Sequence, residues 1–231
     1  MNTKILNELR KLDFESDIEK SISDTFFEGE DKRPYPLPRL GKSLDLKPLA
    51  NHINNIILDN YFRNHWKADW SAFSHSNEGV ADKINATNPD RVIDIGCGDN
   101  KLKDKVQNLV GVDPYNSAAD YEVDILEYDE LDNSFDHAIV FGSINFGNKE
   151  DIEPRLEKAI GLVKPGGTLY FRVNPGLQHT KPEAKWIQFF DWSEENISEY
   201  ANKYNCKVEN LQWERDNGRE QPRIYFELIK C

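Results

Sequence analysis

The residues best suited to chemistry in this sequence are three acids that lie in or directly after short apolar runs. Asp94 lies within the run 92–95 and is followed by glycines at positions 96 and 98. Asp113 ends the next run, 19 residues after Asp94, and Asp124 lies in a third. Glycine lacks a Cβ, so the chain can adopt positive φ there and a ligand can approach the backbone closely. The pattern predicts a ligand-binding turn flanked by carboxylates.

The charges around this turn indicate what it binds. A dinucleotide-binding turn has a third glycine at the position that Lys101 occupies here. Asp94 directly before the turn would repel a pyrophosphate but not a cationic or zwitterionic ligand. An acid at the position of Asp113 can accept both hydroxyls of a ribose. These charges disfavour a dinucleotide and are compatible with a cationic or zwitterionic ligand that carries a ribose.

The elements that position these acids follow from hydrophobic pattern and turn residues. Apolar runs at 92–95, 109–113, 121–125 and 135–141 predict buried strands of a largely parallel sheet. A helix is expected over residues 101–108, directly after the glycine turn.

The run Arg91–Asn100 resembles motif I of the class I S-adenosylmethionine-dependent methyltransferases, an acid–x–Gly–x–Gly pattern at the end of the first strand. Asn100 stands where that family often has a third glycine. Asparagine tolerates left-handed φ well, so it can replace that glycine. The Pro165-Gly166-Gly167 corner before a strand also matches the family, and the resemblance spans residues 78–173.

The resemblance implies S-adenosylmethionine as cofactor and assigns its parts to residues. Asp94 would hold the methionine ammonium group, the turn its amino-acid portion, and Asp113 the ribose, while Asp124 and Ile125 would contact adenine. The full set implied for the cofactor is Asp94, Gly96, Cys97, Gly98, Asp113, Pro114, Asp124, Ile125, Phe141 and Ser143. No spacing typical of a metal site is visible.

The acceptor side is less defined. Ser143 and Asn145 follow the fourth strand and either position an acceptor or form a polar turn. His179 is the histidine best placed to act as a base, with exposure in a loop as the alternative. Arg172 pairs with an acceptor carboxylate or with a structural acid. The aromatic run 186–192 either lines an acceptor pocket or packs in the core.

The remainder of the chain completes the predicted architecture. We expect an N-terminal helical extension with a proline-rich linker over residues 1–43, and a methyltransferase domain over 44–231. Its fold class is α/β, a Rossmann-like doubly wound sheet of seven mostly parallel strands with helices on both faces. Two C-terminal strands form an antiparallel hairpin. Further helices are expected at 45–66 with Asp45 as N-cap, 78–85, 150–163 and 193–204, and the aromatic stretch 66–78 either closes over the cofactor or forms a pinned loop.

Composition narrows the partners. The net charge is −12 and no cluster of Lys and Arg is visible, which argues against nucleic acid. Three scattered cysteines do not form a disulfide framework, and no apolar run is long enough for a membrane span. We expect a cytoplasmic protein whose acceptor is a small molecule, with a protein side chain as the alternative.

Two other functions stay open. The same sheet serves oxidoreductases that use NAD, although Asp94 and Lys101 argue against that chemistry. A non-catalytic module that binds S-adenosylmethionine is the second alternative, because no acceptor motif is recognisable.

Overall fold

The fold is described from a computed structural model of the chain, in residues 1–12, 18–27, 45–67, 74–179, 181–214 and 222–231. These residues form two compact units. The first unit comprises Met1–His65 and Gln178–Gln188, and the second comprises Trp66–Leu177 and Phe189–Cys231. The domain boundary expected at residues 43–44 and the proline-rich stretch before it lie outside the described residues, so both stay predictions.

The first unit is helical. Ile5 and Leu9 of its first helix pack in the same unit as Leu49 and Ile53, and all four side chains are fully buried. The N-terminal stretch, which the sequence predicts to be helical, contains two short helices in the described residues. Its elements are α1 (Thr3–Leu9), α2 (Ile18–Phe26), α3 (Leu46–Asn60), the π-helical turn η2 (Tyr61–His65) and the 3-10 turn η3 (Pro182–Ala184).

Side-chain caps begin the helices of this unit. The Asp45 carboxylate accepts the backbone N–H of Lys47 at 3.0 Å, which confirms the predicted N-cap of α3. Asn2 caps α1, and its amide group also donates to the side-chain oxygen of Asn54 at 2.8 Å and to the backbone oxygen of Trp186 at 2.7 Å. Asn2 thereby joins α1 to α3 and to the segment Gln178–Gln188.

The second unit is built on a six-stranded sheet with the order β2-β1-β3-β4-β6-β5. The strands β2, β1, β3 and β4 are parallel, and β6 runs antiparallel to both β4 and β5. The predicted antiparallel C-terminal strand pair is confirmed. The strands are β1 (Val92–Ile95), β2 (Leu109–Val112), β3 (Phe135–Phe141), β4 (Val163–Val173), β5 (Cys206–Glu214) and β6 (Arg223–Lys230).

The strand expected at residues 121–125 does not form, so the described residues contain six strands rather than seven. Tyr121 makes one isolated parallel bridge to Val112 of β2. Along the rest of that edge, the Asp120 carboxylate already accepts the N–H of Gly111 at 2.7 Å. Asp124 then accepts the N–H of Leu126 at 2.9 Å, which turns the chain away from the sheet.

The helix expected over residues 101–108 is also wrong. This stretch forms successive turns, in which Lys103 donates to Asn100 and Lys105 to Leu102, each three residues back. Lys101 and Lys105 are four residues apart, where like charges destabilise a helix. Because no helix starts here, the glycine turn has no helix N-terminus above which a ligand would lie.

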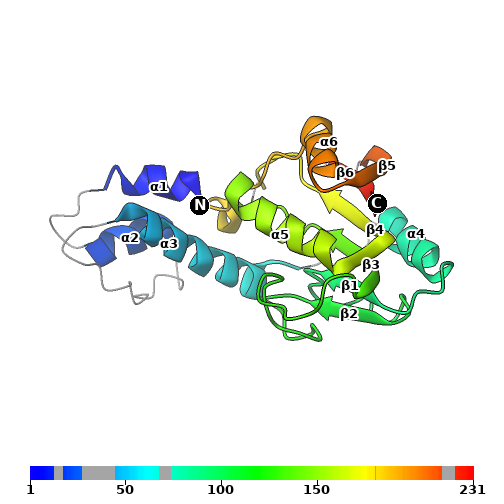
Figure 1. Ribbon diagram of the computed structural model, residues 1–231. Helices are drawn as coiled ribbons and strands as arrows, with labels where there is room; N and C mark the ends of the chain where they lie inside the picture. The colour runs from blue at the N-terminus through cyan, green and yellow to red at the C-terminus, as the bar shows by residue number, and fades with distance from the viewer. Residues whose placement is uncertain (13–17, 28–44, 68–73, 180, 215–221) are drawn as a thin grey trace. The chain divides into compact units, whose positions relative to one another are not determined.

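Helices cover both faces of the sheet, as expected for a doubly wound fold (Figure 1). On one face, Ile152, Leu156 and Ile197 of the covering helices pack on the side chains of Val140 and Phe171. On the other face, Val80 and Ile84 of the covering helix pack in one cluster with Val92, Ile139 and Tyr170 of the sheet. The helices are α5 (Lys149–Leu162) and α6 (Glu194–Lys203) on the first face and α4 (Ser74–Asn85) on the second, where α4 begins four residues before the expected position 78.

Capping groups hold both ends of α5. At the N-terminus of α5, Asn148 and Asp151 form a reciprocal capping box. At its C-terminus, the Lys230 ammonium group of β6 donates to the backbone oxygens of Ile160 at 3.0 Å and Val163 at 2.8 Å. A cation at this end also complements the helix dipole. The helix expected over residues 193–204 is present as α6, and the Ser193 hydroxyl caps it by accepting the N–H of Asn196 at 3.2 Å.

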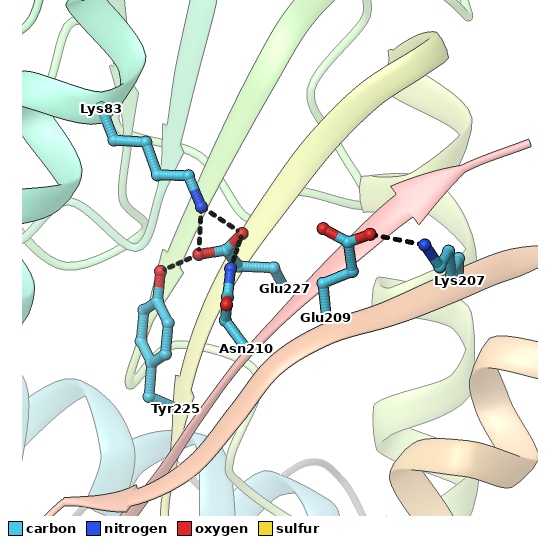
Figure 2. Close-up of polar contacts among 6 residues, drawn as sticks. All are labelled: Lys83, Lys207, Glu209, Asn210, Tyr225 and Glu227. Atoms are coloured by element: carbon cyan, nitrogen blue, oxygen red, sulfur yellow. Dashed lines mark hydrogen bonds and ion pairs between the residues drawn. The ribbon is translucent and has the colours of Figure 1, made fainter.

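The buried carboxylate of Glu227 links α4 to β6 of the sheet (Figure 2). The Glu227 side chain of β6 accepts from the Lys83 ammonium group at 2.6 and 2.8 Å, the Tyr225 hydroxyl at 2.6 Å and the Asn210 amide at 2.9 Å. Asn210 has a left-handed φ of +51° where the β5–β6 register shifts. Burial alone would raise the pKa of Glu227, but these hydrogen bonds hold it below its ordinary value.

We predict that Glu227→Gln lowers the free energy of unfolding at pH 7 by about 2 kcal/mol, because it removes the charge of a buried carboxylate that accepts hydrogen bonds from Lys83, Tyr225 and Asn210. A lowered pKa means that this stabilisation is present above the ordinary glutamate pKa of 4.5 and is lost as the pH falls through the folded-state value. Urea unfolding of both proteins at pH 7 and below pH 4.5 measures the difference.

Glu209→Gln provides the matched control, because Glu209 lies directly opposite Glu227 and pairs with Lys207 on the exposed part of the same strands (Figure 2). We expect it to change stability by less than about 0.5 kcal/mol. Equal effects of the two substitutions at pH 7 would contradict the account.

Candidate functional site

The glycine turn after β1 depends on the missing side chain of Gly96. Gly96 has a φ of +74°, and its N–H donates to the backbone oxygen of Val112 in β2 at 2.7 Å. A Cβ placed on Gly96 would lie 2.2 Å from the Cβ of Ser143, in the loop that follows β3. Only glycine therefore allows the loops after β1 and β3 to meet at this point.

Gly98 makes a second close approach. Its φ is +53°, and a Cβ added there would lie 2.7 Å from the six-membered ring of Trp66. The Trp66 indole thus lies directly against the turn. This contact is the described part of the aromatic stretch 66–78; residues 68–73 of that stretch lie outside the described residues.

Asn100 fits where the methyltransferase family often has a third glycine. Its φ is +53°, a left-handed conformation that asparagine tolerates. Its amide donates to the backbone oxygen of Ala118 at 3.0 Å, and its side chain fills the space beside Gly111 of β2. The replacement expected from the sequence is therefore structurally sound.

Asp94 is the most perturbed acid of the turn. It lies on β1, directly across from Gly111 of β2 and Ile139 of β3, and its side chain is only 4% exposed. Burial, and then the negative charge of Asp113, raise its pKa to about 7. The same burial, with the charges of Asp94 and Asp113, raises the pKa of the neighbouring Cys97 thiol, which is therefore neutral.

Asp113 holds the turn in place. One of its carboxylate oxygens accepts the N–H of Gly98 at 2.9 Å, and the other accepts the N–H of Tyr115 at 2.8 Å. The carboxylate is buried at the carboxyl end of β2, with the half-buried Pro114 next to it. In an open α/β sheet this edge is where ligands bind.

Asp124 and Ile125 lie beyond the Tyr121 bridge at the same edge. The Asp124 carboxylate pairs with the guanidinium group of Arg155 in α5 at 2.8 Å, an ion pair that the sequence did not predict. Ile125 is buried and belongs to the same hydrophobic core cluster as Val112.

The loop after β3 is held by polar contacts of its own. The Asn145 side-chain oxygen accepts the N–H of Asn174 at 3.0 Å, and its backbone oxygen accepts the N–H of Phe190 at 2.7 Å. The indole N–H of Trp192 donates to the backbone oxygen of Ile144 at 3.0 Å. Asn145 thus ties together the loops after β3 and β4.

The remaining alternatives are resolved in part. Trp192 is 1% exposed and packs in the core, so this part of the aromatic run is not a pocket wall. Arg172 is buried and pairs with Glu214 at 3.0 Å, the structural acid that the sequence left open. Phe141 packs against the core under α4. His179 belongs to the first unit, and its role as a base stays a prediction.

Sequence reasoning thus found the residues of the turn and singled out the aromatic stretch that begins at Trp66, but it missed Arg155. The Trp66 contact with Gly98 bridges 32 positions, and the Arg155 pair with Asp124 bridges 31. Arg155 lies in no motif, so only the folded chain brings it to Asp124. In the ranges that the structure describes, no group of three or more His, Cys, Asp or Glu side chains is arranged to hold a metal ion.

We predict that Gly96→Ala destabilises the protein by about 2–4 kcal/mol, because it adds a clash with Ser143 to the cost of left-handed φ. Gly166→Ala is the matched control: its φ is +80°, but no atom lies within 4 Å of the added Cβ. The control should cost only the backbone term, about 1–2 kcal/mol. Urea unfolding of both variants measures this, and a control loss as large as that of Gly96→Ala would refute the steric argument.

Comparison with known proteins rests on structure alone. No protein family model matches the chain, and no curated protein matches its sequence. Its structure is similar to the 1,6-didemethyltoxoflavin-N1-methyltransferase of Burkholderia thailandensis, with a TM-score of 0.60 and 13% identity over 84% of this chain and 94% of that one.

Two further solved structures are similar. The N-methyltransferase NodS of Bradyrhizobium japonicum has a TM-score of 0.56 and 14% identity, over 75% of this chain and 96% of that one. A methyltransferase of Thermotoga maritima, described as a possible histamine N-methyltransferase, has a TM-score of 0.52 and 16% identity, over 76% and 99%. The resemblance seen in the sequence is therefore confirmed in the fold: the chain has the fold of the class I S-adenosylmethionine-dependent methyltransferases.

Proposed function

We propose that the protein is an S-adenosylmethionine-dependent methyltransferase. The observation that carries this proposal is the pair of buried carboxylates, Asp94 and Asp113, around a turn in which Gly96 and Gly98 leave no room for side chains. Such a turn suits a ligand that has a cationic group, a ribose and a main-chain-like portion that lies against backbone. S-adenosylmethionine has all three.

Each residue contributes binding rather than chemistry in this proposal. The Asp94 carboxylate pairs with the ammonium group of the ligand, and the backbone at Gly96, Cys97 and Gly98 contacts its amino-acid portion. Asp113, which is followed by Pro114 and lies at the carboxyl end of β2, accepts hydrogen bonds from the ribose hydroxyls.

The remaining residues predicted for the cofactor contact its adenine group and the side of the turn near β3. Asp124 accepts the adenine amino group and Ile125 contacts the ring, while Phe141 and Ser143 line the side of the turn near β3. The Ser143 hydroxyl is buried and has no hydrogen-bond partner in the described residues, so it is available to a ligand at Gly96.

Methyl transfer asks the protein mainly for orientation. When bound, S-adenosylmethionine supplies a methyl group activated by the sulfonium. The chain holds the donor rigidly through the backbone of the turn, and the loops after β3 and β4, tied by Asn145, define where an acceptor lies. An acceptor amine or hydroxyl must lose a proton, and this is the task that the sequence predicts for His179.

A small-molecule acceptor that takes the methyl group on a nitrogen atom is favoured on two grounds. The similar structures from Burkholderia and Bradyrhizobium are both described as N-methyltransferases, and the former holds 1,6-didemethyltoxoflavin. The net charge of −12 suits a basic amine and disfavours nucleic acid. A protein side chain remains the alternative acceptor, and a cytoplasmic location stays a prediction.

None of the helices in the described ranges has the length and apolar composition that crossing a membrane requires.

A non-catalytic module that binds the same ligand is the second candidate. It is favoured by Asn145, whose side-chain oxygen is already committed to Asn174 and is not free for an acceptor. Binding without methyl transfer to any amine tested would support it. An NAD-dependent oxidoreductase is disfavoured, because the buried Asp94 repels a pyrophosphate.

The raised pKa of Asp94 gives a test of the proposed site. Below pH 7 the carboxyl is mostly protonated, so binding of an ammonium group must first release its proton. We predict that the affinity for S-adenosylhomocysteine, measured by calorimetry, rises about tenfold per pH unit between pH 5 and 7 and then levels off.

Two controls isolate this effect. Asp94→Asn should bind weakly and with little pH dependence, because the titrating group is gone. Methylthioadenosine lacks the ammonium group, so its affinity for the unchanged protein should vary little over the same range. A flat pH profile for S-adenosylhomocysteine with the unchanged protein would refute the role of Asp94.

A further inference from the structure

Hydrogen bonds occupy most of the acceptor positions of the partly buried Asp124 carboxylate, and Arg155 supplies two of them. Arg155 donates through Nη2 at 2.8 Å and Nε at 3.3 Å, and both bonds go to the same Asp124 oxygen, Oδ2. The other oxygen, Oδ1, accepts the N–H of Leu126 at 2.9 Å. The guanidinium group is fixed in turn, because its Nη1 donates to the Asp151 backbone oxygen of α5 at 3.0 Å.

These contacts leave the carboxylate with one acceptor position. An ionised carboxylate has about four lone-pair positions, two on each oxygen. Both positions on Oδ2 are filled by Arg155, and one position on Oδ1 is filled by Leu126. A ligand can therefore donate one hydrogen bond to Asp124, and only at Oδ1.

Stability alone does not account for this arrangement. The side chains of Arg155 and Asp124 are 33% and 27% exposed, and ion pairs with that exposure contribute little to folding. The pair instead fixes the direction of the free position on Oδ1. It acts from α5, whose N-terminus is held by the capping box at Asn148.

We infer that Arg155 is a positioning residue that makes the site selective for a 6-amino purine over a 6-oxo purine. The inference rests on the proposed function, in which Asp124 faces the adenine edge. An amino group donates the one hydrogen bond that Oδ1 can accept. A carbonyl oxygen at the same place donates nothing and meets a negative charge that Arg155 prevents from turning away.

The test compares S-adenosylhomocysteine with S-inosylhomocysteine, which has a carbonyl oxygen in place of the adenine amino group. Calorimetric titration gives the dissociation constant of each for the unchanged protein and for Arg155→Gln. The unchanged protein should bind the adenosyl compound at least about tenfold more tightly. In Arg155→Gln the adenosyl affinity should fall about tenfold, while the inosyl affinity should stay the same or rise, because the Asp124 carboxylate can then turn away from the carbonyl oxygen.

Two further variants keep the result interpretable. Arg91→Gln is the matched control, because Arg91 pairs with Glu130 at 2.8 Å with 41% and 23% exposed side chains, away from the turn. It should leave the ratio of the two dissociation constants unchanged. Arg155→Lys keeps the charge but not the two donors on one oxygen, so it should give an intermediate ratio.

The possible outcomes separate this inference from the proposed function. Equal loss of both affinities in Arg155→Gln, or no change in either, would overturn the positioning role while the proposed function stands. Failure of the unchanged protein to bind either compound would overturn the proposed function, and the inference with it.

Discussion

The site depends on two carboxylates that lie close together under one backbone turn. Asp113 accepts the N–H of Gly98 and so fixes the turn, while its charge and the burial of Asp94 raise the pKa of Asp94 to about 7. Two buried negative charges are costly together, and a bound cation relieves that cost. A positively charged ligand therefore gains binding free energy at this turn by neutralising that charge.

In the second unit, the polar contacts that stabilise the packing of helices on the sheet lie apart from the glycine turn. Glu227 fastens α4 to the sheet through Lys83, and Lys230 caps the C-terminus of α5. Both contacts involve β6, which is separated from β1 by β3 and β4 in the sheet. The glycine turn instead follows β1 and connects it towards β2. The carboxyl ends of the parallel strands, which carry Asp94 and Asp113, can thus be organised for a ligand.

Sequence patterns predicted six of the strands, the glycine turn, the cap at Asp45 and the helix that starts after Ser193, because each depends on residues adjacent in the chain. They failed where long-range contacts decide. The stretch 121–125 has the composition of a strand, but Asp120 occupies the β2 edge that it would need. Arg155 belongs to no motif, and its pairing with Asp124 follows only from the packing of α5 on the sheet.

The central claim is that the turn binds a nucleoside with a cationic amino-acid group and not a dinucleotide. Calorimetric titration of the unchanged protein at pH 8 with S-adenosylhomocysteine and, separately, with NAD tests it most directly. We expect saturable binding of S-adenosylhomocysteine near one molecule per chain and no detectable binding of NAD. Binding of NAD in preference, or of neither compound, would contradict it.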